Sequence, residues 1–473
     1  MTSEAILIGH RELPPPLTPE AVAYGWRQLL YRAGFDPADV PLWYGDPAHA
    51  PASFRGVVVI PCAQDAFDRL LQRPPGTLDT LPPEQAFPAD APSPLAESIP
   101  ILFWGAGRRR TARPLVARRD GGGLILYADL IAAAFFMLSR WEETVVPSRD
   151  EHGRFPAVAG VAYKQGFLLR PIVDEYALLL RAWLAALSPR REPRPRHFAV
   201  RLSHDIDHVR PFPTWKQGMR VLGGDLLKRR SLSQARRTLS ALVTQTLRPA
   251  HTAELKAVAD LADLAARHNL KAVFYFMAAD PAPYDSGYDP ARPPVRSLLK
   301  RLDARGFEIG LHPGYHTLGD PERLAREKAR LDAILGRTDY GGRQHYLRFR
   351  VPDTWRDGER VGLAHDSTLG YADHEGFRCG TCHPFRPFDV QQNREMDLRE
   401  YPPIVMDRTL RGYRRLTPDR ARDRILSLAR RCRRVEGTFT LLWHPAASDD
   451  DGLWTALYRE ILSILSRWQE GRD

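Results

Sequence analysis

The chain has 473 residues, of which 43% are hydrophobic and 10% aromatic. This content is typical of globular proteins and excludes a wholly disordered chain. The length is too great for one typical hydrophobic core, so we expect two domains. The 68 Lys and Arg exceed the 57 Asp and Glu, which leaves a formal charge of +11. Such a charge favours anionic partners, although an arginine-rich composition alone produces the same excess.

Cysteine usage and apolar segments predict a soluble, cytoplasmic protein. Four cysteines are too few for a disulfide framework. The chain opens with Met-Thr-Ser-Glu, which lacks the charged and apolar regions of a secretory leader. The longest apolar run, Leu130 to Leu138, is far shorter than the roughly twenty residues that a membrane span requires.

Residues 1–190 mix helical and strand patterns, which predicts a small α/β domain. The Pro-rich stretch at 189–195 is suited to a linker, so the second domain is expected over residues 191–473. The expected elements of the first domain are a helix at Pro19–Arg32, strands at Gly56–Pro61, Ile99–Trp104 and Gly123–Tyr127, and an apolar helix from Asp129 to Trp141.

A basic insertion occupies Val209–Ala250, which contains nine Lys or Arg and one acid, Asp225. Its leucines recur at helical spacing, so the insertion is predicted to be helical and amphipathic. Two interpretations stay open. We favour a helical cover packed on the second domain, and the alternative is a contact for a membrane surface or an anionic polymer. No nucleic acid partner is expected.

After the insertion, helical and strand patterns alternate. Expected helices at 252–268, 294–305 and 320–335 are interleaved with expected strands at Lys271–Met277 and Phe307–Leu311, and a further strand covers Thr438–Trp443. Repeated helix and strand units predict a parallel sheet or barrel. Enzymes of this architecture carry their chemistry at the carboxyl ends of the strands.

Two carboxylates end the first strand of this second domain. The run from His197 to Ser203 alternates apolar and polar residues, and Asp205 and Asp207 follow. If the strand continues, residues two apart project from the same side, where their like charges repel. A divalent metal is the commonest partner that relieves this repulsion.

Two histidines are candidates for the other metal ligands. His312 and His316 are four residues apart, so both imidazoles would lie on one face of a helical turn. One Asp with two His forms a catalytic zinc set, with three protein ligands and one open position.

His-Asp-Ile-Asp at 204–207, His-x-x-x-His at 312–316 and Leu-Leu-Trp-His-Pro at 441–445 resemble motifs of the polysaccharide deacetylases (NodB homology, carbohydrate esterase family 4). The resemblance covers roughly residues 195–450 and implies a distorted (β/α) barrel. It implies that Asp205 is the general base and His444 the general acid. It also implies that Asp207, His312 and His316 bind Zn²⁺ or another divalent ion such as Co²⁺ or Mn²⁺.

A third motif, residues 343–355, resembles the family's arginine-containing strand, whose guanidinium pairs with the catalytic Asp. Arg343, Arg348 and Arg350 all compete for this role. Arg348 and Arg350 share one face of a strand. The assignment therefore stays open among the three.

The resemblance implies a metal-dependent hydrolase that removes the N-acetyl group from a sugar in a glycan or glycan precursor. The substrate would be a carbohydrate, and anionic and lipid-linked forms are among the candidates. One alternative is hydrolysis of another linear amide or of an O-acetyl ester, because the same metal chemistry does not choose the leaving group. The other is a glycan-binding protein without turnover.

Overall fold

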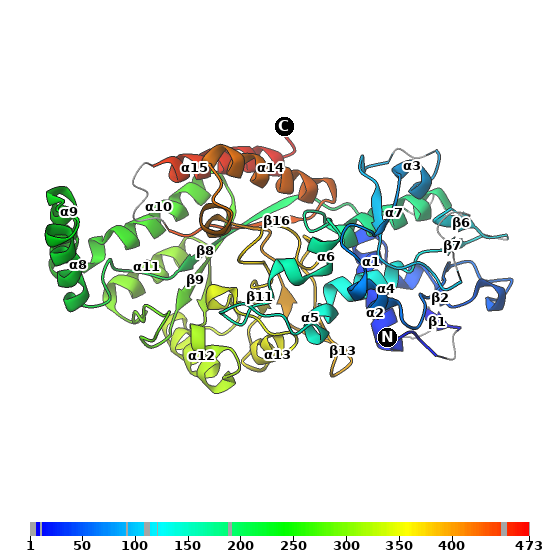
Figure 1. The fold of residues 1–473 in the computed structure, drawn as a ribbon, viewed down its shortest axis with the longest axis horizontal. Helices are drawn as coiled ribbons and strands as arrows, with labels where there is room; N and C mark the ends of the chain where they lie inside the picture. Colours follow the sequence, from blue (N-terminus) through cyan, green and yellow to red (C-terminus); the bar gives the residue numbers. More distant parts are fainter. Residues whose placement is uncertain are drawn as a thin grey trace.

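The structure is a computed structural model that describes residues 6–9, 12–90, 93–107, 114–120, 122–187, 192–445 and 452–472. The molecule is elongated, and two α/β parts lie side by side along its length (Figure 1). The first part runs through helix α7 (Ile172–Leu187), and the second begins with strand β8 (Ala199–Ile206). The predicted boundary at residue 190 lies outside the described residues.

The first part contains a five-stranded sheet with the order β1-β2-β3-β7-β6. Its strands are parallel except β6, which runs antiparallel to β7. The strands are β1 (Ile6–Ile8), β2 (Leu42–Tyr44), β3 (Val57–Val59), β6 (Val116–Arg118) and β7 (Leu124–Leu126), with β4 (Asp79–Leu81) and β5 (Ile99–Ile101) in a separate antiparallel pair. The helices are α1 (Pro19–Ala33), α2 (Ala66–Gln72), α3 (Pro83–Ala86), α4 (Leu130–Leu138), α5 (Trp141–Val145), α6 (Val161–Lys164) and α7.

Local signals explain where the main helices of this part begin and end. Thr18 accepts a hydrogen bond from the Ala21 N–H at the start of α1, and Gly34 ends the helix at φ 85°, a conformation that favours glycine. Asp129 caps α4 by accepting from the Ala132 N–H at 2.9 Å. All residues of α4 are buried, as expected for a helix that is apolar on every side. The helix α1 confirms its prediction. The helix expected from Asp129 to Trp141 starts as predicted but ends at Leu138, because Arg140 takes a left-handed conformation at φ 53° before α5 begins.

The second part contains a five-stranded, wholly parallel sheet with the order β10-β9-β8-β16-β15. This arrangement confirms the predicted parallel α/β class and the alternation of helix and strand. The strands are β8, β9 (Lys271–Met277), β10 (Glu308–His312), β15 (Val405–Met406) and β16 (Thr438–Leu442), with short strands β11 (His365–Asp366), β12 (Phe388–Asp389), β13 (Arg394–Glu395) and β14 (Arg399–Glu400). The helices after β8 are α8 (Trp215–Leu227), α9 (Leu232–Leu247), α10 (Ala253–Arg267), α11 (Pro293–Ala304), α12 (Pro321–Leu335), α13 (Asp353–Arg360), α14 (Pro418–Arg434) and α15 (Leu453–Gln469).

The parallel array continues past β10 but does not close into a ring among the described residues. Gly342 bridges Leu311 of β10 on one side and Asp366 of β11 on the other. β11 then pairs with β14. The end strands β14 and β15 form no ladder with each other. The distorted barrel therefore stays a prediction, whereas the parallel arrangement is observed.

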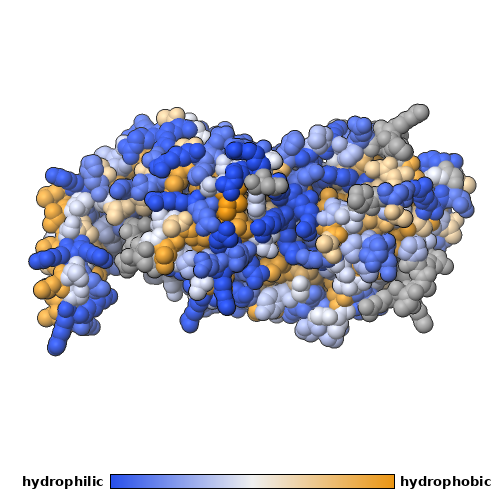
Figure 2. All heavy atoms as spheres, turned by 90° about the horizontal axis from the view of Figure 1, so that it is seen from above, coloured by the Kyte–Doolittle hydropathy of each residue, from blue (hydrophilic) through white to orange (hydrophobic). Residues whose placement is uncertain are grey.

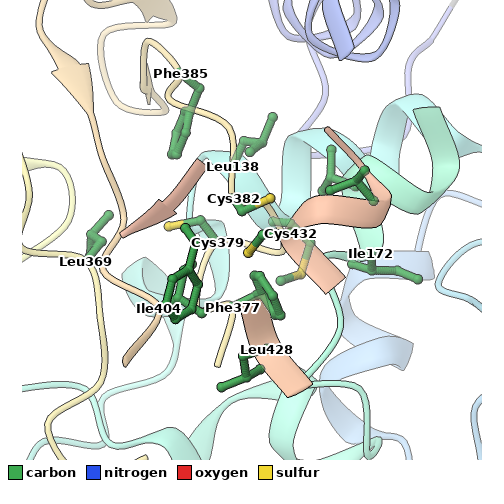
Figure 3. Packing of buried hydrophobic residues seen from close by; sticks show 14 of the residues in the cluster. Leu138, Ile172, Leu369, Phe377, Cys379, Cys382, Phe385, Ile404, Leu428 and Cys432 are labelled. Atoms are coloured by element: carbon green, nitrogen blue, oxygen red, sulfur yellow. The ribbon is translucent and has the colours of Figure 1, made fainter. Parts of the chain in front are cut away.

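The hydrophobic core is continuous across the two parts. Leu138 of α4 and Ile172 of α7 lie in one cluster with Phe377, Leu428 and Cys432 of the second part (Figure 3). Buried ion pairs reinforce the contact, including one between Arg378 Nη2 and Glu143 Oε2 at 2.6 Å. The junction therefore resembles a protein core more than a contact between mobile domains.

The basic insertion folds as a hairpin of α8 and α9, which stands at the end of the molecule farthest from the first part (Figure 1). The two helices pack mainly against each other, with Leu242 fully buried between them. Leu226 and Leu239 are 45% and 48% exposed. The favoured interpretation of a cover packed on the second part is therefore wrong, because most of the apolar stripe faces solvent.

A buried pair of carboxyl groups, Asp366 and Glu400, makes stability depend on pH. Burial raises the pKa of Asp366 to about 6 and that of Glu400 well above its usual value, to which the charge of Asp366 adds. A raised pKa in the folded state means stability that is complete below about pH 4 and is lost as the pH rises through about 6. Between pH 5 and 8 the free energy of unfolding should fall less in Asp366→Asn than in the wild type. The difference between the two falls should be up to about 3 kcal/mol.

Thermal unfolding measured at several pH values tests this expectation. Asp397→Asn is the matched control, because the Asp397 side chain is 89% exposed. If the melting temperatures of the wild type and Asp366→Asn changed with pH in parallel, the expectation would be contradicted.

Candidate metal centre

Asp207 and His312 meet at the carboxyl ends of parallel strands. β8 runs through Ile206, so Asp205 lies within the strand and Asp207 directly follows it. His312 is the last residue of β10. Its Nε2 lies 3.2 Å from Asp207 Oδ1 and 4.0 Å from Asp205 Oδ2.

His345, which the sequence analysis did not select, completes the group. Its Nε2 lies 3.7 Å from Asp207 Oδ1, and its ring centroid lies 5.0 Å from that of His312. Asp207, His312 and His345 each offer one ligand atom within 4.8 Å of the others. The signal that could have identified His345 is its position two residues after Arg343, on the segment that bridges β10 and β11.

His316 lies outside this group, so its predicted place beside His312 is corrected. The prediction assumed a helical turn over residues 312–316. Instead, His312 ends a strand, and only Tyr315–Thr317 forms a short 3-10 turn. His316 is therefore not among the converging donors, and its Nε2 lies 3.2 Å from the Pro283 carbonyl oxygen.

The donor atoms of the group fit a divalent metal. Asp207 Oδ1 and His312 Nε2 are buried without a hydrogen-bond partner. Nδ1 of His312 donates to the Arg343 carbonyl at 2.6 Å, and Nδ1 of His345 donates to Asp285 Oδ1 at 2.8 Å. These bonds leave both Nε2 lone pairs free for a metal. Two ligand atoms of a tetrahedral zinc site lie about 3.4 Å apart. The distances from Asp207 Oδ1 to the two Nε2 atoms, 3.2 and 3.7 Å, lie on either side of this value.

The charges of the group are coupled. Burial alone would raise the pKa of Asp207, but the adjacent His312 imidazole and the charges of His444 and His345 hold it well below its usual value. Burial alone would lower the pKa of His312, but Asp205 and Asp207 raise it above its usual value. Arg343 beside Asp205 and Arg408 beside Asp207 offset part of the negative charge of the two carboxylates, and either protons or a metal ion can supply further positive charge.

Arg343 is the arginine that pairs with Asp205. It is fully buried, and its Nη1 donates to Asp205 Oδ1 at 3.1 Å and to Ser203 Oγ at 2.9 Å. Two further bonds to Ser367 fix the guanidinium. The orientation of the Asp205 carboxylate is therefore determined by a rigid partner.

Arg348 and Arg350 do not reach Asp205, so their assignment to the site is corrected. The expected strand through 343–350 is interrupted by a turn in which Tyr346 and Leu347 have φ of 61° and 53°. Arg348 lies over the Tyr315 ring, 3.9 Å from its centroid, and Arg350 is exposed. The turn redirects the chain, so a face defined by strand spacing no longer exists.

His444 follows β16 and faces the same group. Its Nε2 lies 4.0 Å from both Asp205 Oδ2 and Asp207 Oδ2. Its Nδ1 lies 2.6 Å from Asp407 Oδ1, and Asp407 directly follows β15. Burial would lower the pKa of His444, but the Asp407 carboxylate raises it above its usual value. Asp407 is a further residue that sequence reasoning missed.

A turn of the first part contacts the segments beside the centre. Asp150 accepts from the backbone N–H groups of His152 and Arg154, which makes the turn compact. His152 Nδ1 lies 3.1 Å from the Tyr315 hydroxyl, and Arg154 Nη1 donates to the Tyr346 carbonyl at 3.0 Å. The first part therefore braces the segment that carries His345.

A second group of donors, Asp174, Cys382 and His383, is buried at the junction of the two parts. Its atoms are already engaged. Asp174 pairs with Arg32 Nε at 2.9 Å and accepts from the Thr381 hydroxyl and the Cys382 N–H. Burial raises the pKa of the Cys382 thiol, which disfavours the thiolate that a metal requires. This group is therefore best explained as a polar network that joins the parts.

Comparisons with known proteins give one family match, which lies in the first part, and a distant structural similarity. Residues 84–189 match a family of unknown function (DUF7033). No curated protein matches the chain. A crystal structure of a candidate polysaccharide deacetylase from Mycobacterium smegmatis aligns with a TM-score of 0.37 and 16% identity, over 59% of this chain and 92% of that chain. A similarity of this degree carries no argument about the fold or the site.

Proposed function

We propose that this protein is a metal-dependent hydrolase that removes the N-acetyl group from a sugar in a glycan or glycan precursor. The observation that carries the proposal is the convergence of Asp207, His312 and His345 beside Asp205 and His444. The order of the motifs along the chain, which resembles that of polysaccharide deacetylases, supports the same reading. The proposed metal is Zn²⁺, or another divalent ion such as Co²⁺ or Mn²⁺, held by Asp207, His312 and His345.

The residues around the centre are suited to proton transfer during amide hydrolysis. A divalent metal at such a site supplies a water of lowered pKa and polarises the carbonyl group. In the proposed reaction, Asp205 Oδ2 accepts the proton of the attacking water, while Arg343 holds Oδ1. His444 Nε2 gives a proton to the leaving amine, and Asp407 holds Nδ1.

Exposed tyrosines near the centre support a carbohydrate substrate. Tyr284 is 54% exposed and stacks on Tyr315 with ring centroids 4.4 Å apart. Tyr413 is 50% exposed. Tyrosine rings combine an apolar face with a polar edge, which suits a sugar ring and its hydroxyl groups. Arg408, which is 58% exposed and 3.5 Å from Asp207, supports an anionic sugar or a lipid-linked one with a phosphate group.

Product analysis tests the proposal and separates it from its alternatives. The purified protein is incubated with N-acetylated and O-acetylated sugar oligomers, and free acetate and free amine are measured. We expect acetate and amine in equal amounts from the N-acetylated oligomer, loss of both with a chelator, and recovery with added Zn²⁺. Acetate from the O-acetylated oligomer alone would indicate an esterase, and binding without release of acetate would indicate a non-catalytic protein.

A further inference from the structure

The hairpin of α8 and α9 leaves two apolar stripes uncovered. Residues spaced by four, seven or eleven positions lie on one face of a helix, and each helix carries such a set. The exposed members are Trp215, Met219 and Leu226 on α8 and Leu232, Leu239 and Val243 on α9, each 44–71% exposed. Each helix therefore has an apolar face of which about half or more is exposed among the described residues.

The two stripes lie on the same side of the hairpin. Gly218 of α8 faces Leu242 of α9, and Asp225 faces Thr238, so the helices run antiparallel with these residues between them. Viewed along each helix from its N-terminus, the exposed stripe is rotated about the helix axis away from the side that faces the other helix. The rotation is roughly a quarter turn at 3.6 residues per turn, and it has the same sense in both helices. Because the helices are antiparallel, these equal rotations bring both stripes to one surface.

The hairpin that carries this surface is strongly cationic and has almost no opposing charge. Residues 209–250 contain nine Lys or Arg and one acid, Asp225. Asp225 is 1% exposed, and its carboxylate is bound by Arg229 Nη1 and Thr238 Oγ1, both at 2.6 Å. Figure 2 shows apolar side chains along the outer edge of the hairpin end of the molecule, with hydrophilic side chains projecting between them.

We propose that the hairpin docks on the surface of an anionic lipid bilayer. The apolar stripes would enter the boundary between headgroups and acyl chains, and the Lys and Arg side chains would contact lipid phosphates. Among the described helices, none has the length and apolar content needed to cross a membrane. The contact is therefore peripheral, and it is independent of the chemistry proposed for the metal centre.

A bilayer accounts for both features of this surface, whereas other occupants account for one. An acidic polysaccharide would neutralise the cations but leave the leucines in water. A second copy of the chain would cover the leucines but bring two positively charged hairpins together, which costs free energy. Anionic lipid supplies an apolar phase and negative charge at the same boundary.

Vesicle sedimentation with the full-length protein tests the proposal. Vesicles of phosphatidylcholine alone are compared with vesicles that also contain phosphatidylglycerol, at low and high salt. We expect binding to the anionic vesicles to be at least about tenfold tighter and to weaken with salt, since exposed charges are screened. Equal binding to both vesicle types, or to neither, would overturn the proposal.

Two hairpin variants and one control assign the binding to this surface. The charge variant carries Lys216→Gln, Arg220→Gln, Lys228→Gln and Arg236→Gln, and it keeps Arg229 because Arg229 binds buried Asp225. The apolar variant carries Leu226→Ser, Leu239→Ser and Val243→Ser. The control removes four exposed cations elsewhere, with Lys256→Gln, Arg296→Gln, Lys300→Gln and Arg326→Gln.

We expect both hairpin variants to bind anionic vesicles at least about tenfold more weakly, while the control binds as the wild type does. Equal losses in the charge variant and the control would overturn the proposal, because net charge alone would then explain the binding. A dimer in sedimentation velocity that the apolar variant abolishes would also overturn it. So would retention on an acidic polysaccharide without binding to vesicles.

Discussion

His345→Ala is expected to empty the metal centre, whereas His316→Ala is expected to leave it filled. Nε2 of His345 lies 3.7 Å from Asp207 Oδ1 and belongs to the donor group, but His316 Nε2 lies beside the Pro283 carbonyl. Loss of one of three protein ligands should cost more than the 10–100-fold in affinity that loss of an outer partner costs. Elemental analysis of the purified variants measures the effect as metal bound per chain.

Two further variants show how large the loss of metal in His345→Ala is by comparison. Asp285→Asn changes the residue that accepts from His345 Nδ1 at 2.8 Å, so it should reduce metal affinity by about 10–100-fold without abolishing binding. His316→Ala serves as the matched control, since it also removes an imidazole from a short 3-10 turn, but one outside the donor group. Full metal content in His345→Ala with loss in His316→Ala would restore the ligand set expected from the sequence.

Asp205→Asn is expected to keep the metal and lose on the order of 10²–10⁴ in turnover. Asp205 Oδ1 is engaged by Arg343 at 3.1 Å, and its Oδ2 is 4.0 Å from His312 Nε2, so Asp205 lies beside the donor group without belonging to it. An amide accepts no proton from water at neutral pH, so the base is removed while shape and volume are kept. Metal content and acetate release, measured on the same preparation, separate the two effects.

Arg348→Ala is the control for this variant, because Arg348 was expected at Asp205 but lies on Tyr315 instead. It should retain most of the activity that Asp205→Asn loses. An Asp205→Asn protein without metal would show that Asp205 and Asp207 exchange the roles of base and ligand.

The sequence by itself determined the secondary elements and where the chemistry is carried. The strand that carries Asp205, the cap of α4 at Asp129 and the strand that ends at His312 are local features, set by the alternation of side chains and by the first hydrogen bonds of a helix. Repeated helix and strand units likewise determined the parallel α/β class, because parallel neighbours require such crossovers.

Only the tertiary structure decided which residues meet. The choice between His316 and His345 depends on how the chain turns after β10 and on the bridge that brings residue 342 beside it. The choice of Arg343 over Arg348 and Arg350 depends on left-handed conformations at Tyr346 and Leu347. Neither a turn nor a bridge between distant segments has a period that spacing along the chain can reveal.

The basic hairpin shows the same limit. Its sequence determined that it is helical, amphipathic and positively charged, because these properties follow from spacing and composition. Whether its leucines pack on the second part or face solvent depends on where α8 and α9 stand relative to the sheet. The two helices fill their shared interface with Gly218, Asp225 and Leu242, and the remaining apolar side chains are left outside. An amphipathic pattern states that an apolar face exists, and the tertiary structure alone decides what covers it.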